Sequence, residues 1–164
     1  MRAFVIGIAL TVAAGVVAAQ QPAAQTVKSY SSAADVQALL AKAKTDRKGN
    51  QPTVSERILQ LPPYNANLEY RAAVGPASVH EKEAEFFYVI DGSATMVTGG
   101  KLANETRTNA ENLSGTGIEG GESRAIAKGD FIVVPENTPH WITGINGTIV
   151  LMTLHVPRSV PAAH

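Results

Sequence analysis

Apolar residues recur at helical spacing in only one segment of the chain, close to its N-terminal end. The residues on this apolar face are Val36, Leu39, Leu40 and Ala43. Ser32 and Asp35 stand three positions apart just ahead of them, as in a capping box, and basic residues and a glycine follow Asp46. The pattern predicts one short helix over residues 33–46, within a helical segment that spans residues 32–50.

Downstream of this helix, the apolar residues fall in short strand-like pieces separated by turn residues. We expect strands at residues 55–61, 68–74, 85–90, 94–98, 123–127, 131–134, 140–143 and 149–156. The pair Asp91–Gly92 is expected to form a turn between the third and fourth of these strands. Many short strands with regular turn signals are typical of an antiparallel sandwich or barrel. The sequence therefore predicts an all-β fold with one short N-terminal helix, in which a barrel covers residues 51–157.

The polar stretch between Gly100 and Gly121 shows no hydrophobic period. Connections of this length without secondary structure are usually functional lids or disordered segments. We therefore expect residues 115–121 to move more than the strands and to cover the mouth of a pocket. The glycines of residues 115–120 match a dinucleotide-binding pattern, but no strand precedes them and no apolar helix follows, so we predict no nucleotide cofactor.

The N-terminal end has the three-part layout of a secretory signal peptide. A single positive charge at Arg2 precedes an apolar or small run over residues 3–17, which ends in small residues up to Ala19. This run is about 15 residues long, whereas a membrane-spanning helix needs about 20. We expect cleavage after Ala19 and export to the periplasm or the exterior, with no stable membrane anchor. Residues 20–31 then form a linker, and residues 158–164 form a C-terminal tail.

The charge and aromatic content of the chain argue against some kinds of binding partner. The chain has 14 basic and 14 acidic residues, and removal of Arg2 with the signal peptide leaves a net charge near −1. Such a surface has no electrostatic reason to bind nucleic acid or anionic membrane. An aromatic content of 5% also argues against extensive base-stacking surfaces. We expect a small-molecule ligand or substrate, and the sequence leaves a homodimer open.

Two histidine-containing segments carry the candidate chemistry, and together they resemble the paired motifs of the cupin superfamily. The first family motif reads G-x5-H-x-H-x(3,4)-E-x6-G. Glu85 and Gly92 fit its second half, and His80 fits its second histidine. The family's first histidine corresponds to Ser78, which is a poor ligand for a divalent ion.

The second family motif reads G-x5-P-x-G-x2-H-x3-N. Gly129, Pro135 and His140 stand at the expected spacings, whereas Gly144 replaces the terminal asparagine. Asn137 replaces the middle glycine, a mild change because asparagine tolerates the left-handed backbone better than other residues with side chains. The resemblance implies a cupin-type antiparallel β-barrel, or jelly roll, over roughly residues 55–157.

The resemblance also implies one divalent metal ion, held by His80, Glu85 and His140. Two imidazoles and one carboxylate are a complete set for a catalytic metal, because such sites keep positions open for water or substrate. This set particularly suits Fe(II), and Mn, Zn and Ni remain open. Glu81, Glu83 and His155 are the candidates for a further ligand in the place that Ser78 vacates.

The alternation of side chains along a strand assigns the neighbours of this set to faces. Phe87 and Val89 share the side of Glu85 and are candidates for the apolar wall of a pocket. Tyr88 points the opposite way. Trp141 should likewise face away from the metal and pack on the helix or on a partner subunit.

An open metal site in a barrel can polarise a carbonyl, activate water or bind dioxygen. The first hypothesis is a metal-dependent enzyme that acts on a small oxygenated organic acid, sugar or aromatic compound. The alternative is a non-catalytic periplasmic barrel that binds or stores a small molecule. No base or nucleophile outside the metal set is evident in the sequence, so both hypotheses stay open, and the catalytic residues remain unknown.

Overall fold

A computed structural model of the chain describes residues 26–157. The predicted signal peptide at residues 1–19 and the predicted tail at residues 158–164 lie outside the described residues, as does the first part of the predicted linker. Within the described range, no helix is both long and apolar enough to cross a membrane.

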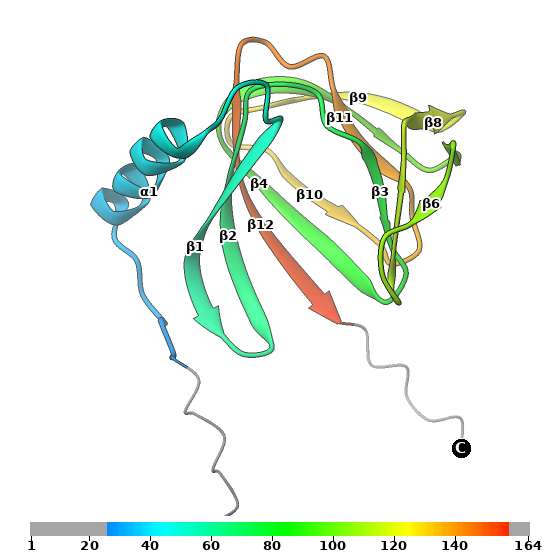
Figure 1. Cartoon of the computed structure of the whole chain (residues 1–164). Helices are drawn as coiled ribbons and strands as arrows, with labels where there is room; N and C mark the ends of the chain where they lie inside the picture. The colour runs from blue at the N-terminus through cyan, green and yellow to red at the C-terminus, as the bar shows by residue number, and fades with distance from the viewer. Residues whose placement is uncertain (1–25, 158–164) are drawn as a thin grey trace, which may run out of the picture.

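Helix α1 (Ala33–Asp46) has the predicted bounds and the predicted cap. The Ser32 hydroxyl accepts a hydrogen bond from the Asp35 backbone N–H at 3.1 Å, and the Asp35 carboxylate accepts one from the Ser32 backbone N–H at 2.8 Å. The apolar face of α1 packs against strands β1 (Thr53–Leu61) and β2 (Tyr64–Arg71) in a core cluster around Ala43 and Leu68. The helix therefore covers the outer side of the β1–β2 hairpin (Figure 1).

The remaining strands of the main sheet are β3 (Ala77–His80), β4 (Glu83–Thr98), β6 (Thr106–Arg107), β7 (Asn112–Gly115), β9 (Glu122–Ala127), β10 (Phe131–Val134), β11 (His140–Thr143) and β12 (Ile149–Pro157). Their order is β1-β2-β12-β4-β11-β3-β7-β6, with β9 and β10 also paired to β4, and every pair is antiparallel. This sheet is not closed. Strand β4 belongs to two layers: its first half pairs with β12 and β10, and its second half pairs with β11 and β9.

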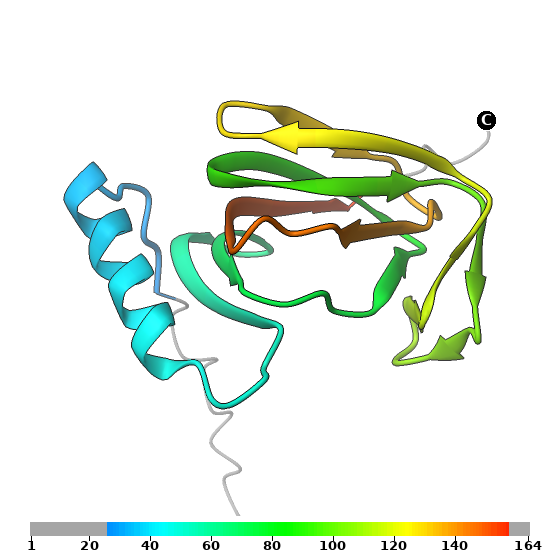
Figure 2. The same ribbon diagram turned by 90° about the horizontal axis from the view of Figure 1, so that it is seen from above.

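The two layers face each other and enclose the main core, as Figures 1 and 2 show from two directions. The largest side chains of this core include Phe87, Met96, Ile142 and Leu151, each at most 3% exposed. The predicted all-β fold with one N-terminal helix is confirmed, as a two-layered antiparallel jelly roll.

One predicted turn is wrong. Asp91–Gly92 does not reverse the chain, because β4 continues through it as a single strand of 16 residues. Gly92 has φ +84°, and a Cβ built on it would lie 2.2 Å from the carbonyl oxygen of Thr148. The register of β12 against β4 shifts at the same level, between Val150 and Leu151. The glycine thus lets β4 bend from one layer into the other.

The prediction of a structureless connection between Gly100 and Gly121 is also wrong. This stretch contains β6, β7 and a separate two-stranded sheet of β5 (Lys101–Ala103) and β8 (Gly117–Glu119). Gly115 and Gly117 are buried rather than part of a free loop. The sequence does not reveal these strands, because they lack an alternating apolar pattern. Backbone pairing, mainly of β7 with β3, holds them in place.

Candidate metal centre

Four ionisable side chains meet between the two layers, two from each layer. Glu85 on β4 is the direct cross-strand partner of His155 on β12, so their side chains share the inward face of one layer. On the other layer, His140 of β11 pairs with Ser78 of β3, and His80 follows Ser78 by two residues on the same face. The structure thus brings together the three predicted residues and adds His155.

The Nε2 atoms of all three histidines point at the Glu85 carboxylate. His140 Nε2 lies 3.0 Å and His80 Nε2 lies 3.2 Å from Oε2, and His155 Nε2 lies 3.4 Å from Oε1. Glu85 is 4% exposed and His140 is 7% exposed. The possible ligand atoms of His80, Glu85 and His155 all lie within 4.8 Å of one another, close enough to share one metal ion.

The other nitrogen of two histidines meets a hydrogen-bond acceptor, which sets the tautomer. His80 Nδ1 lies 2.6 Å from Asn112 Oδ1, and His140 Nδ1 lies 3.1 Å from the carbonyl oxygen of Thr138. Both oxygens can only accept, so each neutral imidazole carries its proton on Nδ1. The lone pairs of the two Nε2 atoms are therefore directed at Glu85.

This arrangement fits a metal ion. Lone pairs of imidazole nitrogens and carboxylate oxygens repel at about 3 Å unless a proton or a cation lies between them. One proton could join a single imidazole to Glu85, but charging all three histidines would place three positive charges around one carboxylate. A divalent cation would satisfy His80, Glu85 and His155 together, with His140 Nε2 also 3.0 Å from the carboxylate, and nitrogen and oxygen donors suit Fe, Mn, Zn or Ni.

The electrostatics of Glu85 agree with a role as an anionic ligand. Burial raises the pKa of its carboxyl group, but the close contacts with the imidazoles of His140, His155 and His80 outweigh burial and hold that pKa well below its usual range. Glu85 is therefore ionised at neutral pH. A buried carboxylate with three imidazoles around it has the charge that a cation requires.

Of the three candidates for a further ligand, His155 is the one that the structure brings to the centre. Hydrogen bonding to Glu85 raises the pKa of His155 most, burial opposes this, and the charges of Glu85, Glu83 and Glu69 add to the rise. Glu83 lies behind His155, with Oε2 3.3 Å from Nδ1, although the geometry is not that of a hydrogen bond. Glu81 points elsewhere and binds Arg107.

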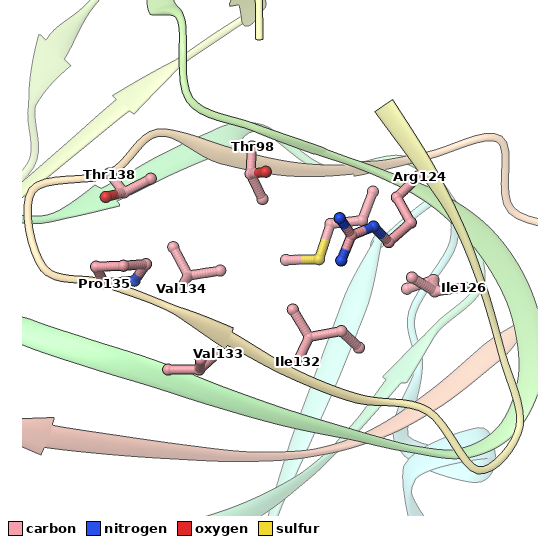
Figure 3. Close-up of a pocket in the computed structure, with 9 residues that line it drawn as sticks. Thr98, Arg124, Ile126, Ile132, Val133, Val134, Pro135 and Thr138 are labelled. Carbon is pink, nitrogen blue, oxygen red and sulfur yellow. The ribbon is translucent and has the colours of Figure 1, made fainter. Parts of the chain in front are cut away.

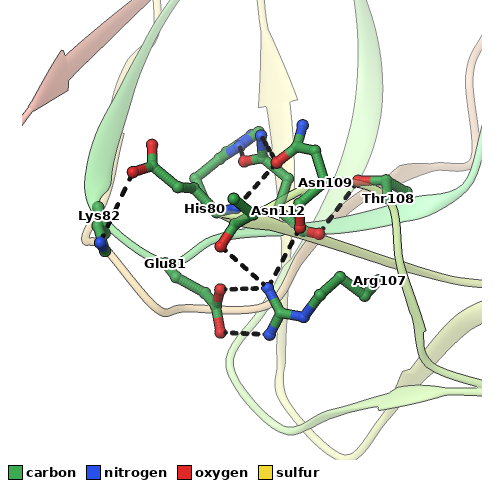
Figure 4. Close-up of polar contacts among 9 residues, drawn as sticks. His80, Glu81, Lys82, Arg107, Thr108, Asn109 and Asn112 are labelled. Carbon is green, nitrogen blue, oxygen red and sulfur yellow. Dashed lines mark hydrogen bonds and ion pairs between the residues drawn. The ribbon is translucent and has the colours of Figure 1, made fainter.

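Hydrogen bonds and an ion pair surround His80 on the side of its Nδ1 atom, away from Glu85 (Figure 4). Asn112 is the cross-strand partner of His80, and its Nδ2 donates to Asn109 Oδ1 at 3.0 Å. This bond orients the amide so that Oδ1 faces His80. Arg107 binds the carboxylate of Glu81 through two nitrogens, at 2.7 and 3.0 Å, and so joins the segment around Asn109 to the residue next to His80.

The turn before His140 is hydrogen-bonded to β3, the strand that carries His80. Asn137 has φ +55°, in the left-handed region that the family motif gives to glycine, and its backbone N–H donates to the carbonyl of His80 at 2.7 Å. The predicted tolerance of asparagine at this position is confirmed. The two histidine motifs are thus linked by a backbone hydrogen bond as well as through Glu85.

Both residues predicted for the apolar wall are buried in the main core. The ring of Phe87 lies 6.0 Å from that of His140, so Phe87 borders the centre. Tyr88 points outward and stacks on Phe131, as expected from the alternation. Trp141 also faces away from the centre, but it donates to the carbonyl of Gly75 rather than packing on the helix.

A cavity of about 120 Å³ lies between β9, β10 and the second half of β4 (Figure 3). Its walls are mainly apolar, with the hydroxyls of Thr98 and Thr138 and the guanidinium of Arg124 as polar groups. Thr98 is the cross-strand partner of His140, and Val134, another wall residue, is the partner of Glu85. The cavity therefore lies one strand away from two of the candidate ligands and has room for a group of a few atoms.

Comparisons with known proteins agree with this architecture. The family model described as Cupin matches residues 50–159 of the chain. No curated protein sequence matches the chain. The solved structure of FeII HppE has a TM-score of 0.51 and 15% sequence identity, and the match covers 67% of this chain and 54% of HppE.

Two further solved structures are similar. TT1209 from Thermus thermophilus has a TM-score of 0.51 and 15% identity, over 73% of this chain and 95% of its own. Hydroxypropylphosphonic acid epoxidase from S. wedmorenis has a TM-score of 0.50 and 16% identity, over 65% of this chain and 51% of its own. This chain thus spans about half the length of HppE and of the epoxidase. At these identities, the likeness shows the fold alone.

Proposed function

Because the chain belongs to the cupin family, we propose that it binds one divalent metal ion through His80, Glu85 and His140 and acts as an enzyme on a small oxygenated organic molecule. His155 is the fourth donor in this proposal. The observation that carries it is the convergence of three imidazole Nε2 atoms on one buried carboxylate. The signal-peptide pattern at residues 1–19 supports a periplasmic or secreted location as part of the same proposal.

When bound, the ion would supply Lewis acidity to an oxygen of the substrate. The protein residues would do the rest. Asn112 and the Thr138 carbonyl hold the Nδ1 protons of His80 and His140, so that both Nε2 atoms stay available as donors. Phe87 keeps one side of the centre apolar, which strengthens electrostatic interactions there. The cavity beside Thr98 leaves room for part of a small substrate.

Similar folds support a metal-dependent chemistry without fixing it. The solved HppE structure is that of its Fe(II) form, and this is a property of HppE. The donor set of this chain would accept Fe(II) and also Mn, Zn or Ni. We propose a divalent ion of this group.

The alternative function is a non-catalytic periplasmic barrel that binds or stores a small molecule. One observation favours it: within residues 26–157, no serine, threonine or tyrosine hydroxyl is hydrogen-bonded to a histidine as an activated nucleophile would be. Turnover distinguishes the two functions. Protein loaded with each of the four metals is incubated with a panel of organic acids, sugars and aromatic compounds, while oxygen uptake and product mass are followed. The proposal predicts turnover of at least one class with one of the metals, and binding without turnover across the panel would favour the alternative.

A further inference from the structure

Strand β2 turns a row of polar side chains toward the space between the layers. Its residues Ala66, Leu68 and Tyr70 pack against the apolar face of α1. Successive side chains of a strand point to opposite faces, so the other residues of the strand face inward. These inward residues are Asn65, Asn67, Glu69 and Arg71.

Strands β2 and β12 lie side by side (Figure 1), and their register joins this polar row to the metal centre. The cross-strand pairs are Thr153 with Asn67, Leu151 with Glu69, and Ile149 with Arg71. Paired residues share a face, and His155 follows Thr153 by two residues on the same face. Asn67 is thus a diagonal neighbour of His155, at a separation of about 7–8 Å.

Glu69 and Arg71 form an ion pair that is largely shielded from water. Arg71 Nε and Nη2 donate to the single oxygen Oε2 of Glu69, at 2.9 and 2.6 Å, and the Arg71 and Glu69 side chains are 18% and 15% exposed. Arg71 Nη1 has no hydrogen-bond partner within the described residues. Nη1 is not enclosed by the protein, so it stays accessible to a ligand and can donate to an anion.

Two further polar groups between Arg71 and the metal centre lack partners. The hydroxyl of Thr153 has no hydrogen-bond partner, and the residue is 0% exposed. The side chain of Asn67 is partly buried, and its amide is not enclosed by the protein, so it stays accessible to a ligand. A hydroxyl and an amide without partners, on the same face of the sheet as a guanidinium, are groups that recognise the oxygens of a polar ligand.

Charge balance also favours an anionic ligand. The Glu69–Arg71 pair is neutral as a unit, and of the proposed ligands only Glu85 is negative, with Glu83 behind His155. The imidazole donors leave the positive charge of the ion available to an oxygen of an anionic ligand. Arginine suits this task because its planar guanidinium binds carboxylate and phosphate oxygens through paired N–H donors.

We infer that Asn67, Arg71 and Thr153 form an oxyanion-binding subsite, and that the ligand is a small organic acid whose far oxyanion binds Arg71 while another oxygen approaches the metal. Glu69 is a positioning residue that holds the guanidinium. The inference rests on the proposed function, since it extends the same site. Carboxylate and phosphonate groups share the required chemistry.

Calorimetric titration of Mn²⁺-loaded protein with the linear dicarboxylates from succinate to pimelate tests the subsite. Each acid is compared with its monoamide, which keeps one carboxylate for the metal and removes the charge at the far end. The expected result is that at least one diacid binds about ten- to a hundredfold more tightly than its monoamide, the range for a hydrogen bond to a charged group. Equal affinities of every diacid and its monoamide would overturn the inference.

Variants identify the residue responsible. Arg71→Gln should remove the preference for the diacid, whereas Arg47→Gln, which makes the same change in charge at a residue following α1, should keep it. Should Arg71→Gln fail to fold because Glu69 loses its partner, Asn67→Ala tests the same subsite, since it leaves no charge unpaired. A full preference for the diacid in a folded Arg71→Gln or in Asn67→Ala would contradict the assignment.

Two further experiments show which oxyanion the subsite prefers and whether a negative result comes from the subsite or from the metal site. Replacing one carboxylate of the best diacid by a phosphonate shows which oxyanion the subsite prefers, and a preference of either kind over the monoamide supports it. Metal-free protein is titrated in parallel. Should no metal bind, the proposed function fails, while binding of a diacid that depends on Arg71 would still support the subsite.

Discussion

Glu85 and His155 face each other directly across β4 and β12, with Glu85 Oε1 3.4 Å from His155 Nε2. The imidazole that the family motif places at Ser78 is thus absent from β3, and an imidazole from the last strand lies at the centre instead. Ser78 still lies nearby, as the cross-strand partner of His140. The centre therefore has as many candidate donors as the family motif, with one histidine supplied by β12 instead of β3.

The first prediction tests whether His155 on β12 takes the place of the histidine that the family motif has at position 78 on β3. His155→Ala should weaken metal binding by more than about a hundredfold, because the loss of a ligand should exceed the ten- to hundredfold effect of losing an outer-shell partner. Adding Ser78→His to this variant should recover a large part of the loss, since residue 78 faces the same space. Calorimetric metal titration of the single and double variants measures both effects. If His155→Ala binds metal like the unmodified protein, His155 is not a ligand.

A second prediction concerns His140, which contributes a donor from the opposite layer. His140→Ala should abolish measurable metal binding while the melting temperature of the metal-free protein changes little. The substitution removes a polar group that faces the centre rather than a core hydrophobe, so the large cost of a core cavity should not arise. Metal titration and a thermal melt of the metal-free variant measure the two effects. Unchanged metal affinity would show that His140 lies outside the coordination sphere.

Asn112 should tune the centre without touching the metal. Asn112→Ala should weaken metal binding by about ten- to a hundredfold, because His80 loses the acceptor that holds its Nδ1 proton. Asn112→Asp restores an acceptor and should bring the affinity back. With Co²⁺ as the probe, the visible absorption spectrum should change in the alanine variant and return in the aspartate variant. Asn146→Ala, at an exposed loop asparagine, is the matched control, and an equal effect there would argue for a purely structural role of Asn112.

The cap of α1 gives a prediction about pH. Hydrogen bonds from the Ser32 backbone and side chain lower the pKa of Asp35. The folded state therefore favours the ionised carboxylate, and this contribution is present above the unfolded pKa of about 4 and is lost as the pH falls through the lowered value. Asp35→Ala should reduce the melting temperature at pH 6, and the difference from the unmodified protein should shrink toward pH 2. A difference that is constant over this range would contradict the assignment.

Much of the fold could be predicted because its local signals agree with its tertiary structure. The capping box at Ser32 and Asp35 and the apolar face of α1 fixed the helix bounds, and β10 and β11 have the predicted bounds as well. The turn at Asp91–Gly92 was misjudged because a glycine with positive φ serves equally well for a reversal and for a bend within a long strand. Only the pairing with β12 decides between the two.

The site was predictable where its residues stand in motifs, and less so where they depend on pairing between distant strands. The spacing of the two motifs identified His80, Glu85 and His140 as candidates, and the structure brings their side chains together. The alternation of β12 places His155 on the side of the buried Leu151 and Thr153, a signal that the sequence contains. The inward direction of Glu69 and Arg71 could not be inferred, because a polar strand face ordinarily indicates solvent, whereas here α1 covers the apolar face instead.

The most direct test of the central claim is the metal content of the protein, purified without chelator and compared with Glu85→Gln. Glutamine keeps the size of the side chain and removes the negative charge that the three imidazoles surround. Elemental analysis should find about one divalent ion per chain in the unmodified protein and a strongly reduced content in the variant. Near-zero occupancy of the unmodified protein after reconstitution with Fe, Mn, Zn and Ni, or equal content in the two proteins, would contradict the metal centre.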